Sequence, residues 1–200
     1  MNKSALKKRE TIDKILQAAA KEIQTKGIDS ARISVIAAEA GVTKQLVYHY
    51  FETKDHMYVS ILESAAEGMR LTKNVDIYQT LEPSAAIELI IDTIFTGFAK
   101  NPSYTVLALD QALHHGDHIS PNNDFTASMK DFIEQVFPQI LQRGQHRGVF
   151  RKDLEPELTF WMIFNLVASY FLNNNIMQRV TQADYESPQA LEQWRTASVT

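Results

Sequence analysis

The chain has 200 residues, an apolar fraction of 44% and a formal net charge of −4. This composition supports a hydrophobic core and excludes a globally disordered chain. The sequence contains no cysteine, which excludes disulfides, thiolate catalysis and cysteine-bound zinc and is compatible with a reducing compartment. The most apolar stretch, residues 158–172, is shorter than the ~20 residues of a membrane span, and the basic N-terminus lacks the apolar run of a signal peptide. We therefore expect a cytoplasmic protein without a membrane partner.

The charge is unevenly distributed along the chain. Residues 1–56 hold ten Lys/Arg against seven Asp/Glu, whereas the remainder holds ten against seventeen. A weakly basic head on an acidic body is compatible with a DNA-binding segment attached to a domain with another task.

Helical periodicity dominates the N-terminal third. Apolar residues spaced by three and four predict a helix over residues 7–26, ended by Gly27. A second helix is predicted over residues 33–40, and Gly41 permits a sharp turn before a third. Thr43 is expected to cap the third helix, because its hydroxyl can accept from an amide of the first turn. The pattern predicts a helix-turn-helix, with an ordinary corner between helices in an all-helical enzyme as the alternative.

The rest of the chain also predicts helices, so the fold class is all-α. They are expected over residues 53–73, 83–100, 103–115, 124–147 and 156–177, and from residue 188, with residues 74–81 irregular. Pro138 should interrupt the helix that contains it, because it removes one backbone hydrogen bond and crowds the carbonyl of Glu134. The helix that begins at Pro156 is apolar almost all round, so all its sides should be covered. A second copy of the chain is expected to cover one of them.

Short motifs at characteristic spacings resemble the TetR family of transcriptional regulators. In the first 62 residues they are Ile15-Leu16-Gln17-Ala18-Ala19, Gly27, Ile36-Ala37, Ala40-Gly41-Val42-Thr43, Tyr48-His49-Tyr50-Phe51 and Thr53-Lys54-Asp55. A looser match follows at Gly144, Gly148, Phe150-Arg151 and Asp153-Leu154-Glu155-Pro156-Glu157. The resemblance implies a three-helix DNA-binding domain over residues 1–53 and a helical effector-binding and dimerisation domain over residues 54–200. It also implies a homodimeric, non-enzymatic repressor without a cofactor, released from a palindromic operator by a small-molecule effector.

The resemblance also implies which residues meet DNA: Arg32, Thr43, Lys44, Gln45, Leu46, Tyr48, His49, Tyr50 and Lys54. Their chemistry agrees, since Lys44 can reach guanine or a phosphate and Gln45 can pair with adenine. Two positions depart from the family pattern. Arg32 stands where many members have threonine, and Leu46 stands where a small or polar residue is usual. Leu46 could meet a thymine methyl group.

The second domain of this family usually encloses a small-molecule pocket. Residues whose type and position suit such a pocket are Phe95, Phe98, Tyr104, Leu107, Gln111, His114, Trp161, Phe164 and Asn165. Aromatic residues at helical spacing are more often plain core, so most of these are also expected to pack. Asn165 lies within an apolar helix and therefore needs a partner, whether a ligand, a water molecule or its twin across a dimer.

Two other functional classes remain open from the residues. One is a helical metal-dependent enzyme that uses His114, His115 and His118. Adjacent histidines diverge on a helix and no second ligand pair supports them, so no metal site is predicted. The other is a protein-interaction module without specific DNA binding.

Overall fold

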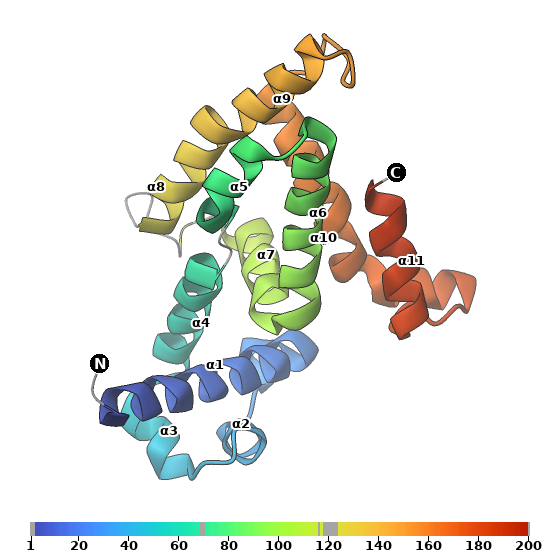
Figure 1. The fold of residues 1–200 in the computed structure, drawn as a ribbon. Helices are drawn as coiled ribbons and strands as arrows, with labels where there is room; N and C mark the ends of the chain where they lie inside the picture. Colours follow the sequence, from blue (N-terminus) through green and yellow to red (C-terminus); the bar gives the residue numbers. More distant parts are fainter. Residues whose placement is uncertain (1–2, 69–70, 116, 118–123, 200) are drawn as a thin grey trace. The chain divides into compact units, whose positions relative to one another are not determined.

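The computed structural model describes residues 3–68, 71–115, 117 and 124–199, and every regular element in these ranges is a helix (Figure 1). The chain divides into two compact units. The first unit comprises residues 1–68 and 100–119, and the second comprises residues 69–99 and 120–200. The predicted all-α fold is confirmed. The sequence predicted a DNA-binding domain that ends at residue 53 and an effector-binding domain that follows it. This functional division is distinct from the two packing units, and it stays a prediction.

The first unit is built around its N-terminal helix. It contains α1 (Lys3–Ser30), α2 (Ile33–Glu39), α3 (Lys44–Tyr50), α4 (Lys54–Gly68) and α7 (Pro102–His114). Helix α1 packs against α2, α4 and α7, and Ile15, Ala19, Ile36, Val47 and Ile61 are completely buried between these elements. Gly27 has a φ of 75° and interrupts α1, as predicted for the residue that ends this helix.

The second unit has an aromatic core. It contains η1 (Leu71–Asn74), α5 (Val75–Thr80), α6 (Pro83–Lys100), α8 (Asp124–Asp131), η2 (Phe132–Val136), α9 (Phe137–His146), α10 (Pro156–Thr181) and α11 (Pro188–Val199). Phe160 of α10 is fully buried, and its ring centroid lies 5.9 Å from that of Phe132 and 5.4 Å from that of Phe137. These contacts join α10 to the helices that precede it.

Residues 75–80 form helix α5, so the prediction that this stretch is irregular is wrong. The helix depends on contacts with residues distant in sequence. Arg143 of α9 donates to the backbone carbonyls of Tyr78, at 2.7 Å, and Gln79. The Tyr78 ring is fully buried, with its centroid 5.8 Å from that of Phe132. A short segment without a clear apolar stripe therefore becomes helical through its neighbours.

The long helix predicted over residues 124–147 is interrupted ahead of Pro138. Residues Phe132–Val136 form the π-helical segment η2, in which the amide of Phe137 donates to the carbonyl of Phe132. Pro138 follows at once and has no amide hydrogen to continue the ladder. The predicted interruption is therefore present, and it takes the form of one wide turn.

The link between α9 and α10 is held by side chains of α9. Gln145 Nε2 donates to the carbonyls of Arg151, Lys152 and Leu154 at 3.1–3.3 Å. Gly144 lies directly under the ring of Phe150, where a Cβ atom would overlap the ring. Glu155 then caps α10 by accepting from the amide of Leu158 at 2.6 Å.

Candidate nucleic-acid interface

The turn between α2 and α3 is fixed by local chemistry. Gly41 adopts a φ of 68°, a conformation that favours glycine. Thr43 Oγ1 accepts a hydrogen bond from the amide of Leu46 at 3.2 Å and so caps α3. The Val47 side chain is completely buried and Phe51 is nearly so. The cap and these two anchors determine which face of α3 points outward.

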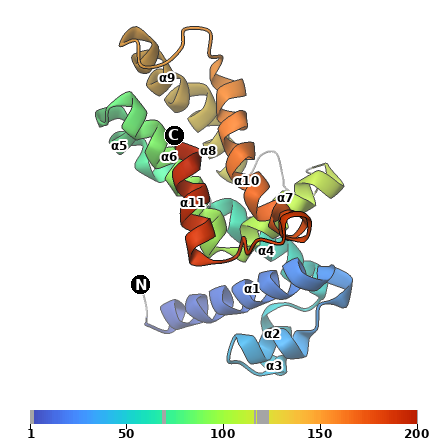
Figure 2. The ribbon, with the colours of Figure 1, turned by 90° about the vertical axis from the view of Figure 1, so that its right-hand side faces the viewer.

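The outward face of α3 is polar. Lys44, Gln45 and His49 are exposed, and the Tyr48 side chain is 54% exposed. Leu46 and Tyr50 are half-buried at the edges of this face, and the rings of Tyr50 and His49 meet edge to face with centroids 5.2 Å apart. Figure 2 shows α2 and α3 together on one side of α1. A short helix with such a face is suited to enter a major groove.

Three basic residues outside α3 differ in their exposure and in their contacts with the first unit. Arg32 is exposed at the start of α2, without a capping bond from its side chain. Lys54 Nζ donates to the carbonyl of Asp29 at 3.1 Å, so it connects the start of α4 to the last turn of α1. Lys8 Nζ lies 5.8 Å from the centre of the Tyr50 ring, within the range of a cation–π contact. The sequence indicated neither contact, because each joins residues far apart in the chain.

The residues expected to line an effector pocket occur in both units. Phe95 and Phe98 are buried on α6, and Phe164 of α10 is half-buried with its ring centroid 6.1 Å from that of Phe98. The centroids of Trp161 and Phe164 are 5.8 Å apart. Asn165 is exposed, and its Nδ2 donates to the carbonyl of Trp161 at 2.8 Å.

The other four expected pocket residues lie on α7 in the first unit. Tyr104 and Leu107 are buried, Gln111 is half-buried and His114 is exposed. The effector pocket stays a prediction.

A buried carboxylate joins α4 to α7, and the sequence analysis missed it. Asp110 of α7 is only 1% exposed, and its Oδ1 accepts from the Tyr58 hydroxyl of α4 at 2.5 Å. His114 Nδ1 lies 3.1 Å from the same oxygen. Burial, and then the hydrogen bond to Asp110, raise the pKa of Tyr58 well above its ordinary value. The sequence did contain one indication of this contact: Asp110 directly follows the apolar run 106–109, and a carboxylate buried with such a run needs a partner.

The histidines at the end of α7 do not converge. The side chain of His114 faces Asp110, and His115 ends the helix in a left-handed conformation with a φ of 53°. His118 lies outside the described residues. Within the described ranges, no group of His, Asp and Glu side chains is arranged to hold a metal ion. Among the same residues, no helix combines the length and apolarity needed to cross a bilayer.

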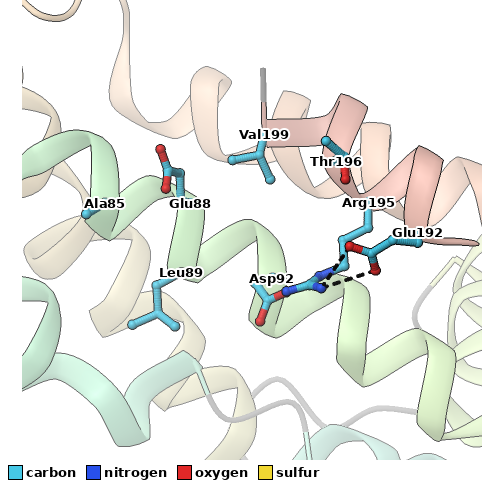
Figure 3. Close-up of a pocket in the computed structure, with 8 residues that line it drawn as sticks. All are labelled: Ala85, Glu88, Leu89, Asp92, Glu192, Arg195, Thr196 and Val199. Carbon is cyan, nitrogen blue, oxygen red and sulfur yellow. Dashed lines mark hydrogen bonds and ion pairs between the residues drawn. The ribbon is translucent and has the colours of Figure 1, made fainter.

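A hollow of about 790 Å³ lies between α6 and α11 (Figure 3). Arg195 of α11 points to α6, with its Nε 2.5 Å from Asp92 Oδ1, and it also lies 3.3 Å from Glu192. The remaining lining residues are Ala85, Glu88, Leu89, Thr196 and Val199. None of the expected pocket residues lines this hollow. The guanidinium group of Arg195, which does line it, is already paired with the carboxylates of Asp92 and Glu192.

The sequence matches two family models that together cover most of the chain. The model described as bacterial regulatory proteins of the tetR family matches residues 15–61, and a tetracyclin repressor-like C-terminal domain matches residues 83–200. The chain is 25% identical to the HTH-type transcriptional repressor NicS of Pseudomonas putida over 186 residues, which covers 93% of this chain and 87% of NicS.

Solved structures share the fold. The TetR-family regulator PfmR from Thermus thermophilus has a TM-score of 0.61 at 23% identity, over 92% of this chain and 94% of PfmR. AibR, solved with isovaleryl coenzyme A and operator DNA, has a TM-score of 0.61 at 15% identity, over 94% of this chain and 96% of AibR.

Proposed function

Because the chain belongs to the TetR family of bacterial regulatory proteins, we propose that it represses transcription as a homodimer on a palindromic operator and that a small-molecule effector releases it. It is a DNA-binding transcriptional regulator. The name of NicS, a transcriptional repressor, supports repression, and the complex of AibR with isovaleryl coenzyme A and operator DNA supports control by an effector. The proposed regulator works in the cytoplasm, has no catalytic activity and needs no cofactor.

The observation that carries this proposal is helix α3. Its cap at Thr43 and its anchor at Val47 hold Lys44, Gln45, Tyr48 and His49 toward solvent. Amide and ammonium groups at the start of a helix suit base edges, whereas the tyrosine hydroxyl suits a phosphate. In the proposed interface Thr43, Leu46, Tyr50 and Arg32 border these residues. Lys54 is also proposed to contact DNA, and its Nζ donates to the carbonyl of Asp29 in the last turn of α1.

The proposed dimer places one α3 helix in each of two successive major grooves. Two such helices must lie about 34–36 Å apart to meet equivalent half-sites one turn apart. An effector that binds better to a state with another spacing shifts the population toward that state and weakens operator binding. In this proposal the effector binds within a domain that begins at residue 54, and the predicted pocket residues are the candidates for contacting it.

The proposal is tested by selecting the genomic DNA fragments that the purified protein retains and footprinting the strongest of them. We expect a palindrome, with an affinity that falls steeply as salt concentration rises. The variants Lys44→Ala and Tyr48→Ala should each lose about tenfold or more in affinity, as expected for losing about 1–3 kcal/mol of contact energy. Lys152→Ala, an exposed lysine in the link before α10, is the matched control and should bind normally.

Two results would contradict the proposal. Failure to enrich any sequence would favour a protein-interaction module over a specific DNA-binding protein. Unchanged footprints for both the Lys44 and the Tyr48 variants would show that α3 is not the contacting helix.

A further inference from the structure

Helix α10 carries exposed apolar side chains on one face toward both of its ends, and Ser169 and Leu172 between them are half-buried. Large side chains on one face are exposed at Leu158 (60%), Met162 (64%), Leu166 (51%), Ile176 (55%) and Val180 (74%). Their spacing of mostly four residues places them on one side of an α-helix. Trp161, Asn165, Ser169, Leu172 and Asn173 fall on the same side at this periodicity. We call this set of residues the α10 stripe.

The α10 stripe is uncharged up to its last turn, where the exposed Arg179 lies on the same side as Trp161. Residues 158–178 contain no Asp, Glu, Lys or Arg, although the chain as a whole is 22% charged. A long exposed apolar surface without charges is typical of an interface rather than of a solvated helix. No charged ligand or nucleic acid suits such a surface.

The order of residues along the stripe is symmetric about Ser169. In a two-fold interface, residue i of one subunit meets residue j of the other, and j meets i. Two antiparallel α10 helices related by an axis at Ser169 would bring together positions equally distant from it on either side. Those pairs are Leu158 with Val180, Trp161 with Met177, Met162 with Ile176, Asn165 with Asn173, and Leu166 with Leu172.

Every such pair joins side chains of the same kind. Apolar positions meet apolar ones, the two asparagines meet each other, and Ser169 meets its own copy. Moving the axis to Phe171 would instead place Asn165 against Met177 and Trp161 against Thr181. A buried amide opposite a thioether loses hydrogen bonds, so that alternative register is unfavourable.

The two asparagines retain capacity for a bond between subunits. Asn165 Nδ2 donates to the carbonyl of Trp161 at 2.8 Å, and Asn173 Nδ2 donates to that of Ser169 at 2.9 Å. A side-chain amide has two N–H groups and a carbonyl oxygen, so each asparagine can still donate once and accept. A polar pair within an apolar helix interface fixes the register of the helices, because shifted registers leave it unsatisfied.

From this pattern we infer that the two-fold axis of the homodimer passes at Ser169, with each α10 antiparallel to its copy and Asn165 bonded to the partner subunit's Asn173. The inference rests on the proposed homodimer, and it specifies which residues of the two α10 helices face each other. The occupant of the α10 stripe is therefore a second copy of this chain.

The absence of cysteine allows a direct test by single-cysteine cross-linking of the full chain. Ser169→Cys should form a disulfide-linked dimer under mild oxidation, because a disulfide needs Cα atoms about 4.4–6.8 Å apart and residue 169 would face its own copy. Gln178→Cys is the matched control on the same helix. It is also exposed but lies on the opposite side, so it should remain uncross-linked.

A second arm tests the register itself. Asn165→Cys should not link to itself, whereas a mixture of Asn165→Cys and Asn173→Cys proteins should form a mixed disulfide. Sedimentation of the unmodified protein at micromolar concentration tests dimerisation separately. A dimer in which Ser169→Cys fails to link, or in which Asn165→Cys links to itself, overturns the register and leaves the proposed function standing. A monomer overturns the proposed homodimer and the register with it.

Discussion

At the residue scale, Thr43 links the stability of α3 to DNA binding. Its hydroxyl accepts from the amide of Leu46, and the side chain is otherwise exposed. Thr43→Ala removes the cap, so we expect the free energy of unfolding to fall by about 1 kcal/mol. Operator affinity should fall as well, because the first turn of α3 frays. Chemical denaturation and a binding titration measure the two effects.

Thr43→Ser is the matched control for this prediction. It retains a hydroxyl in the same place and should keep both stability and affinity close to those of the native chain. A stable Thr43→Ala protein with normal operator binding would show that the cap contributes nothing to α3.

Single residues differ in how far their roles can be predicted from the sequence. Gly41 and Thr43 follow local rules, and both behave as predicted. Lys54 was predicted to meet DNA, yet in the structure it also bonds to the carbonyl of Asp29, a partner that sequence spacing does not reveal. Tyr58 escaped notice for the same reason, because its partner Asp110 comes from another helix.

At the element scale, the Tyr58–Asp110 hydrogen bond connects α4 to α7. Tyr58→Phe removes the donor to a buried carboxylate, and we expect the free energy of unfolding at neutral pH to fall by about 1–3 kcal/mol. The raised pKa of Tyr58 also gives this contribution a pH dependence. The folded state holds the proton more tightly than the unfolded state does. The stabilisation is therefore complete below the ordinary tyrosine pKa of about 10 and declines as pH rises above it.

Denaturation of the native and Tyr58→Phe proteins between pH 7 and pH 11 measures this dependence. The difference between their unfolding free energies should shrink above about pH 10. A residual slope should remain in the variant, because burial also raises the pKa values of Tyr78 and Tyr170. Tyr48→Phe, at an exposed position, is the control and should follow the native curve. A constant difference across this range would contradict the prediction.

Helices with a continuous apolar stripe could be predicted, whereas elements that depend on distant contacts could not. The stripes of α1, α4 and α6 indicated these helices directly. Helix α5 has only six residues and is supported by Arg143 from a much later helix. The interruption near Pro138 was predictable from the missing amide, but its form as a π-helical turn was not.

At the scale of the whole molecule, the proposed dimer makes operator geometry testable. Inserting five base pairs at the centre of the operator rotates one half-site by about half a turn relative to the other. Two α3 helices in one rigid dimer could then no longer reach both half-sites, so affinity should fall to that of a single half-site. An operator with five substitutions at its centre is the control of unchanged spacing. Equal affinity for the two operators would contradict a symmetric dimer.

The arrangement of distant segments in the whole molecule is what the sequence predicted least well. Apolar periodicity predicted the order of the helices, and the family resemblance predicted the DNA-binding segment; both depend on patterns that are local in the sequence. It did not predict that α7 packs with the N-terminal unit, which depends on the contact of α7 with α1 and α4. The effector pocket stays a prediction, because no local pattern distinguishes an aromatic side chain that lines a pocket from one that packs in the core.

The wide turn at η2 changes the phase of everything that follows it. In an uninterrupted α-helix, the buried residues Met129 and Phe132 would point, on average, about 130° away from the later buried residues Phe137 and Leu141. The extra residue in the turn rotates the later part back by about 100°, so that both parts bury the same side. An alignment of this chain with a relative that has a straight helix here must therefore contain a one-residue gap within residues 132–136. Without that gap, core positions of one protein are compared with surface positions of the other.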